Sequence, residues 1–221
     1  MLNIRNRFIS LTLRLAALIA ISILFGFYLN SISRFVTGFM RFEVQVGVLY
    51  IITLALEVLF NLIDMRHGIK GYPAGVYMPF KLSVTTYAIM ASGLYLALTF
   101  STIANEKNPE GFSYAICLLL FAVLDWILFD EKGTVKYGAA AALSIFPVFY
   151  MVFCMIRPHI FTNTPMYDGG LEYPYFFLDP KQVSMPILSI AIVVVLIVAL
   201  FFFIVLLNNI FSGKYRKRTN D

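Results

Sequence analysis

Ionisable and polar side chains occur inside long apolar segments of this chain, at Glu57, Asn61, Lys81 and Asp125. An ionisable group at membrane depth is costly, so it marks a functional position by default. A buried carboxylate has to be paired with a cation or protonated. Glu57 and Lys81 lie toward the same end of their segments, and we therefore predict that they form a pair.

The polar residues of the second segment share one helical face. At about 100° per residue, Glu43, Tyr50, Glu57, Asn61 and Asp64 fall on the same side and should face other helices. Polar residues of the third segment form a similar stripe: Lys81, Thr85, Ser92, Tyr95, Thr99 and Thr102. In the fourth segment, Tyr114 and Asp125 are spaced so that they lie on nearly the same side of the helix. The competing interpretation is that the hydroxyl groups only join helices by hydrogen bonds.

The composition indicates a membrane protein. Of the 221 residues, 60% are hydrophobic and 13% are charged, whereas soluble domains are about half apolar and a quarter charged. The net charge of +5 does not indicate a nucleic-acid partner, because the basic residues gather at the ends of apolar segments. That distribution is typical of membrane topology.

The apolar segments predict an all-α bundle of six membrane-spanning helices in one domain, residues 1–221. A span needs about 20 mostly apolar residues, and lipid requires backbone groups to pair within the segment. The first segment also fits a cleavable signal peptide, which would leave five spans. Pro147 should bend the fifth span. The predicted spans are 8–30, 42–63, 79–104, 112–129, 137–156 and 187–207.

Motifs for metals, cofactors or soluble catalysis are absent from the sequence. Cys117 and Cys154 stand in apolar runs, where cysteine behaves as a small hydrophobe. His67 and His159 are far apart, and no zinc or haem spacing joins them to the cysteines. No phosphate-binding glycine loop, GxSxG or HExxH occurs. We therefore predict neither a metal nor a cofactor.

Residues 125–179 resemble a known membrane family. The run Asp125-Trp126-Ile127-Leu128-Phe129-Asp130, followed by Lys132-Gly133, is similar to an element of the bacterial Pr6Pr membrane proteins, relatives of the FAR-17a/AIG1-like proteins. The similarity extends more weakly over residues 35–207. It continues through Phe146-Pro147 and Tyr150, then Tyr173-Pro174-Tyr175 and Phe177-Leu178-Asp179, with Phe42 and Gln45 in the second segment.

The resemblance implies six membrane helices and suggests an activity. The AIG1-like branch hydrolyses lipid esters of hydroxy fatty acids with an intramembrane Thr nucleophile and a His partner. The corresponding positions here are Glu43 and Ala115. A hydroxyl nucleophile needs a nearby base, and neither family residue is present. Glu43 with the adjacent Tyr114 is the candidate for a rebuilt catalytic site.

The sequence leaves three alternative functions for this protein. The first is a non-catalytic protein of the cell membrane, in a bacterial plasma membrane, that binds a lipid, an acyl chain or another membrane protein. The second is a lipid-ester hydrolase that uses Glu43 and Tyr114. The third is a small transporter or proton-coupled carrier that uses Glu57 and Lys81, although no inverted repeat supports it.

The distribution of Lys and Arg predicts that both termini are cytoplasmic. With six spans, 12 of the 17 basic residues lie on the side of the termini and 5 on the other. Alkaline phosphatase, which is active only outside the cytoplasm, should therefore be inactive when fused after Asp221 and active when fused after Gly170. Enzyme activity of the Asp221 fusion in intact cells would contradict this topology.

Overall fold

A computed structural model describes residues 6–32, 35–67, 75–100, 109–160, 172–179, 181 and 186–212. Every regular element within these ranges is helical. The elements are α1 (Arg7–Ser31), α2 (Phe35–Phe39), α3 (Phe42–Arg66), α4 (Met78–Phe100), α5 (Pro109–Phe129), α6 (Tyr137–Leu143), α7 (Ile145–Ile160), the 3-10 turn η2 (Phe176–Leu178) and α8 (Pro186–Ile210). The predicted all-α class is confirmed.

Five helical stretches in the described part of the chain are long and apolar enough to cross a membrane. They are Arg7–Ser31, Phe42–Arg66, Pro109–Phe129, Tyr137–Ile160 and Ile190–Ile210. Large apolar side chains such as Ile23, Leu59, Val195 and Phe203 remain exposed on their outer faces. An exposed apolar exterior of this extent matches a lipid environment rather than water. The chain therefore has the construction of a multi-pass membrane protein.

The predicted span 79–104 is not among these five stretches. It corresponds to α4, which is 23 residues long and carries several polar side chains. These side chains are buried among the neighbouring helices: Lys81, Ser83, Thr85, Thr86 and Ser92. The Thr99 side chain and Thr102, which belong to the predicted polar stripe, lie outside the described residues.

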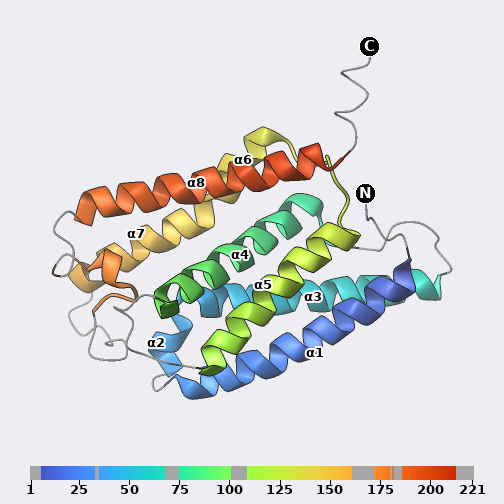
Figure 1. Cartoon of the computed structure of the whole chain (residues 1–221), viewed down its shortest axis with the longest axis horizontal. Coiled ribbons are helices and arrows are strands. Elements are labelled where there is room, and N and C mark those ends of the chain that lie inside the picture. Colours follow the sequence, from blue (N-terminus) through green and yellow to red (C-terminus); the bar gives the residue numbers. More distant parts are fainter. Residues whose placement is uncertain are drawn as a thin grey trace, which may run out of the picture.

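Four long helices form a closed ring in which each packs against the next. The order around the ring is α1, α3, α4 and α5, with α5 returning to α1. A second layer of α6, α7 and α8 packs along α4, and η2 contacts α8 (Figure 1). In Figure 1, α1 begins and α8 ends at the same end of the bundle.

The predicted polar face of α3 does point into this ring. Glu43, Tyr50, Glu57 and Asn61 are all buried. Asp64, in the last turn of α3, is partly exposed, and its Oδ2 lies 3.1 Å from Nη1 of Arg7. The helical period therefore predicted the buried face of α3 correctly from Glu43 to Asn61.

The sequence predicts that Pro147 bends the fifth span, and the structure has an interruption of the helix near this residue. The helix breaks at Ser144, between α6 and α7. Proline has no backbone N–H, so the carbonyl of Leu143, four residues earlier, loses its helical partner. The Tyr87 hydroxyl, from α4, donates a hydrogen bond of 2.7 Å to that carbonyl. A side chain of the ring thus satisfies the backbone group that the proline leaves free.

Replacing Tyr87 by phenylalanine should lower stability, because the Leu143 carbonyl would lose its donor. An unmade hydrogen bond at a buried group costs about 1–3 kcal/mol. Thermal unfolding of purified Tyr87→Phe in detergent, with Tyr77→Phe at an exposed position as the control, measures this cost.

A second substitution tests the explanation itself. Pro147→Ala restores an N–H for the Leu143 carbonyl, so Tyr87→Phe should cost less in that background. An equal cost of Tyr87→Phe in both backgrounds would show that the hydroxyl does not compensate for the proline.

Candidate functional site

Each of the four ring helices contributes charge to one buried cluster. Its members are Arg14 from α1, Glu57 from α3, Lys81 from α4, Asp125 from α5 and Asp130, which directly follows α5; all five are buried. We refer to these five residues as the charged cluster. They meet because α1 and α4 begin, and α3 and α5 end, at the same end of the bundle (Figure 1).

Lys81 lies at the centre of the charged cluster. Its Nζ is 2.8 Å from Oε1 of Glu57 and 2.5 Å from Oδ2 of Asp125, and it also contacts Oδ1 of Asp130. The predicted pairing of Glu57 with Lys81 is confirmed, and Asp125 is a further partner. One ammonium group thus bridges carboxylates of two helices and the residue after α5.

Arg14 forms the second cationic contact. Its Nε lies 2.8 Å from Oδ1 of Asp125 and 3.4 Å from Oε2 of Glu57, and its Nη2 lies 3.7 Å from Oδ1 of Asp130. Arg14 is one of the 12 basic residues counted on the side of the termini, and its role in the cluster was not predicted from the sequence. The available signal was its position two turns inside an apolar span, where a charge is expensive.

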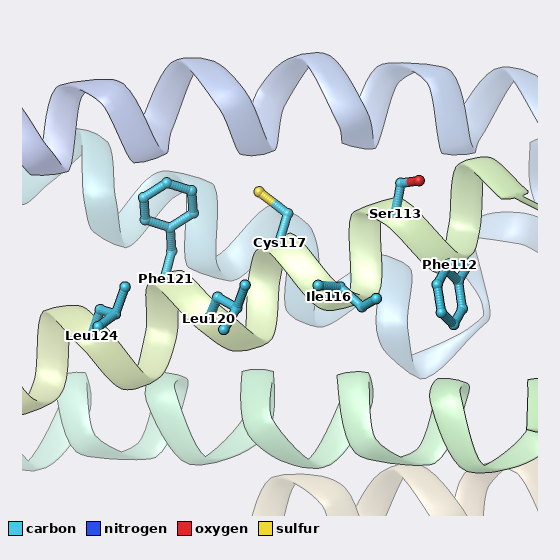
Figure 2. A pocket seen from close by; sticks show the side chains of 7 residues that line it. All are labelled: Phe112, Ser113, Ile116, Cys117, Leu120, Phe121 and Leu124. Atoms are coloured by element: carbon cyan, nitrogen blue, oxygen red, sulfur yellow. The ribbon is translucent and has the colours of Figure 1, made fainter.

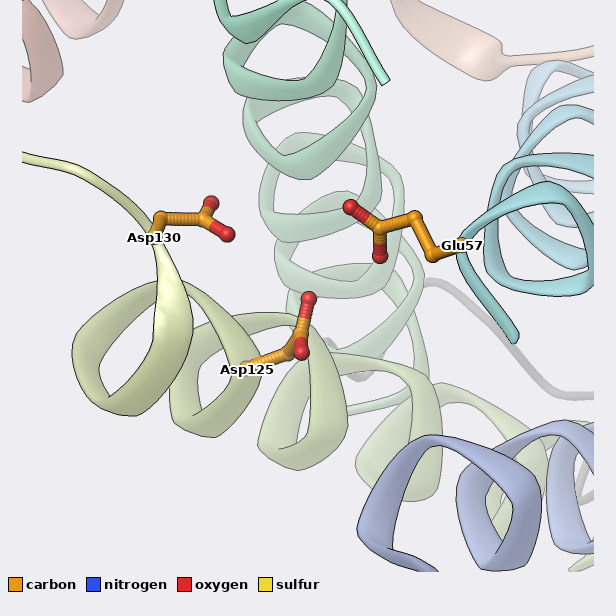
Figure 3. A group of neighbouring side chains, drawn as sticks. All are labelled: Glu57, Asp125 and Asp130. Atoms are coloured by element: carbon orange, nitrogen blue, oxygen red, sulfur yellow. The ribbon is translucent and has the colours of Figure 1, made fainter. Parts of the chain in front are cut away.

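The three carboxylates converge on one space (Figure 3), with one oxygen of each within 4.8 Å of the others. This geometry could hold a metal ion if the space were open. The Nζ of Lys81, however, contacts all three carboxylates. An ammonium group therefore occupies the position that a divalent cation would need, and the cluster does not fit a metal centre.

Two other polar residues lie near the charged cluster. Asn61 is buried one turn beyond Glu57 on α3. Lys132, between α5 and α6, lies with its Nζ 4.1 Å from the centre of the Trp126 ring and donates to the Trp126 carbonyl. Burial lowers the pKa of Lys132 to about 8, while the nearby Asp130 acts in the opposite direction.

The opposite end of the ring is organised around Glu43. Its carboxylate accepts hydrogen bonds from the hydroxyl of Tyr175, at 2.6 Å, and from that of Tyr28, at 3.1 Å. The Tyr175 oxygen in turn accepts from the backbone N–H of Phe42 at 3.2 Å, and Arg41 lies 4.0 Å from Glu43. Glu43 therefore joins α1, α3 and the segment before α8.

Tyr114, the other catalytic candidate, is also buried at this end. Its hydroxyl donates to the backbone carbonyl of Glu43 at 3.4 Å, and its ring stacks on Tyr28 with centroids 5.3 Å apart. A Cβ atom at Gly47 would collide with the Tyr114 hydroxyl, so the glycine gives the ring its space. The structure thus brings Tyr114 to Glu43, but through the backbone rather than the carboxylate.

The residues that carry the family resemblance have separate structural roles. Trp126 Nε1 donates to Oδ1 of Asn208 on α8 at 3.3 Å. Gly133 has a φ of +78°, and its N–H bonds to the Asn208 carbonyl. Asp179 Oδ1 accepts from the backbone of Lys181 at 2.8 Å. Tyr173 is buried and Pro174 half-buried beside it, before η2. Among the residues that carry the resemblance, Asp125 and Asp130 belong to the charged cluster.

An apolar groove runs along α5 toward the charged cluster. It has a volume of about 440 Å³ and is lined by one face of α5, from Phe112 to Leu124, between α1 and α4 (Figure 2). A smaller cavity of about 70 Å³ shares Phe121 and Leu124 with it and reaches Arg14 and Asp125. The two spaces therefore adjoin at Phe121 and Leu124, and the smaller one is lined by an ion pair.

The comparisons add no relative, because no family model, curated protein or solved structure matches this chain.

Lys81→Met should strongly destabilise the protein. It would leave the three buried carboxylates of the charged cluster with Arg14 as its one remaining cationic member, and breaking a buried ion pair costs roughly 3–5 kcal/mol. Lys136→Met removes the same charge at an exposed position and should have little effect. Thermal unfolding in detergent measures both variants, and equal melting temperatures would show that the buried ammonium is dispensable.

Proposed function

We propose that this chain is a six-span protein of a bacterial plasma membrane with both termini in the cytoplasm. The sixth span is α4, which packs between α3 and α5 along the same bundle. An even number of spans is supported by the common end at which α1 begins and α8 ends (Figure 1). The charged cluster then lies in the cytoplasmic half and Glu43 in the outer half.

The function that we propose is non-catalytic binding of a lipid or other amphiphile along α5. The observation that carries this proposal is that the apolar groove and the small cavity at Arg14 and Asp125 share Phe121 and Leu124 in their walls. A volume of about 440 Å³ falls within the range of small-molecule sites, about 300–1,000 Å³. The groove would take an acyl chain, and the cavity would take part of a polar head group.

The size of the cavity limits what the head group can be. A volume of about 70 Å³ corresponds to roughly two water molecules at about 30 Å³ each. A hydroxyl, amine or ester oxygen fits this space, whereas most of a larger head group would remain at the membrane surface. The bound molecule is therefore recognised mainly through its chain.

Ester hydrolysis by Glu43 and Tyr114 is a less favoured function. The Glu43 carboxylate is engaged by two tyrosine hydroxyls, and the Tyr114 hydroxyl points to a backbone carbonyl. A general base has to lie within hydrogen-bond reach of the group that it activates. The Tyr114 hydroxyl is bonded to the backbone carbonyl of Glu43 and not to its carboxylate. We nevertheless retain membership of the Pr6Pr family, with its motif in a structural role, as part of the proposal.

Transport is the second candidate function, and the charged cluster favours it. Ionisable groups inside a membrane domain often mark ion or substrate pathways. The cluster joins four helices, so a change in its charge would alter the packing of the whole ring. The groove and the cluster could then belong to one carrier.

Filling the groove with a larger side chain should reduce lipid binding. Leu120→Trp adds an aromatic ring in the wall of the groove, whereas Leu196→Trp places the same ring on the exposed face of α8. Native mass spectrometry of protein purified in mild detergent should detect bound lipid in wild type and Leu196→Trp, and several-fold less in Leu120→Trp. Equal lipid occupancy in the three proteins would contradict binding in the groove.

A further inference from the structure

The small cavity beside the groove has one polar wall. The described residues that line it belong to α1, α3 and α5, and they are apolar except for Arg14 and Asp125. The cavity adjoins the groove at Phe121 and Leu124, which line both spaces. The chemistry of the Arg14–Asp125 pair therefore limits how a molecule that binds along α5 can end.

We propose that the molecule bound along α5 is a single-chain lipid that ends in an uncharged hydroxyl group. The chain lies in the groove, and the hydroxyl group enters the small cavity past Phe121 and Leu124. There it donates a hydrogen bond to the carboxylate of Asp125. This inference rests on the proposed function, because it names the class of lipid that the groove takes.

The more accessible member of the ion pair is the hydrogen-bond acceptor. The side chain of Asp125 is 9% exposed, whereas that of Arg14 is 3% exposed. Asp125 Oδ1 accepts from Arg14 Nε at 2.8 Å, and Nζ of Lys81 lies 2.5 Å from Oδ2. A carboxylate offers about four lone-pair sites, so Asp125 can accept a further hydrogen bond. A ligand that reaches this wall therefore has to be a donor.

The cations beside Asp125 disfavour a charged ligand end. A ligand ammonium group would meet Lys81 and Arg14, which already contact Asp125. A ligand carboxylate would have to compete with Asp125 for the Arg14 guanidinium group. In addition, removing an ion from water costs far more than removing a hydroxyl group. An uncharged donor avoids both costs.

The dimensions of the two spaces restrict the ligand further. The cavity has a volume of about 70 Å³, or roughly two water molecules at about 30 Å³ each, which a hydroxyl group fits and a phosphodiester or sugar head group does not. The groove follows one face of α5 from Phe112 to Leu124 (Figure 2). That stretch is about 18 Å long at 1.5 Å per residue. A single extended chain matches one helical face better than the two chains of a phospholipid.

The test compares probes that share one chain and differ in the polar end: hexadecanol, its methyl ether, hexadecylamine and palmitic acid. Each unlabelled probe competes with tritiated hexadecanol for the full-length protein, delipidated in detergent at neutral pH. The methyl ether keeps the oxygen but has no donor. A hydrogen bond to a charged group is worth about tenfold or more in affinity. Hexadecanol should therefore displace the label at about one-tenth of the ether concentration, and both charged probes should be weaker than hexadecanol.

A matched pair of variants tests where the hydroxyl group binds. Ala17 is buried and lines the small cavity, so Ala17→Val fills part of that space. The adjacent Ala16 is exposed, and Ala16→Val adds the same atoms outside the cavity. Ala17→Val should bind hexadecanol and the ether equally, whereas Ala16→Val should keep the wild-type ratio. Comparing this ratio between proteins cancels any difference in how the probes partition into detergent.

The outcomes separate this inference from groove binding itself. Equal displacement by hexadecanol and the ether in wild type, with less label bound to Leu120→Trp, would overturn the hydroxyl assignment and leave the proposed function intact. Stronger displacement by hexadecylamine or palmitic acid, or an unchanged ratio in Ala17→Val, would also overturn the assignment. Binding of the label to Leu120→Trp at the wild-type level would instead contradict the groove as the binding site. If Ala17→Val fails to fold, the comparison of probes in wild type still decides.

Discussion

The contact of one lysine ammonium group with three carboxylates is the constraint on which the rest of this structure depends. Lys81 can reach Glu57, Asp125 and Asp130 only if α3, α4 and α5 end or begin at the same level. Arg14 adds the same requirement for α1. Because removing a charge from water costs several kcal/mol per ion, any misplacement of one helix leaves a charge uncompensated. The cluster thus favours a single register for the four-helix ring.

The other end of the ring is fixed by weaker and more numerous contacts. Glu43 is joined to Tyr28 and Tyr175 by hydrogen bonds, and stacked aromatic rings fill the space between α1 and α5. In lipid, apolar contact alone gives little preference between helix partners, so packing and hydrogen bonds determine which helices associate. Specific polar contacts are therefore found at both ends, with apolar packing between them.

The sequence predicted the helices and the Glu57–Lys81 pair because both depend on local features. Span length follows from membrane thickness, and a helical period assigns Glu57 to the inner face without knowledge of the other helices. The remaining cluster depends on tertiary structure. Arg14 stands two turns inside a span, but its position alone does not identify its partners, and Asp130 resembles a loop residue until the ring places it beside Lys81. The Tyr175–Glu43 bond joins residues that are 132 apart in sequence, and no periodicity could reveal it.

Burial inside the bundle explains how α4 can carry polar side chains within a membrane domain. A helix with Lys81 and several hydroxyl groups on its surface is poorly suited to lipid, but α4 contacts α3 and α5 as well as the second layer of α6 and α8. Its polar side chains therefore face protein on most sides, where Ser and Thr can bond to their own backbone, as Ser83 and Thr86 do at 2.8 and 2.7 Å. The helix that packs against both its ring neighbours and the second layer is thus also the one that carries the ammonium group at the centre of the charged cluster.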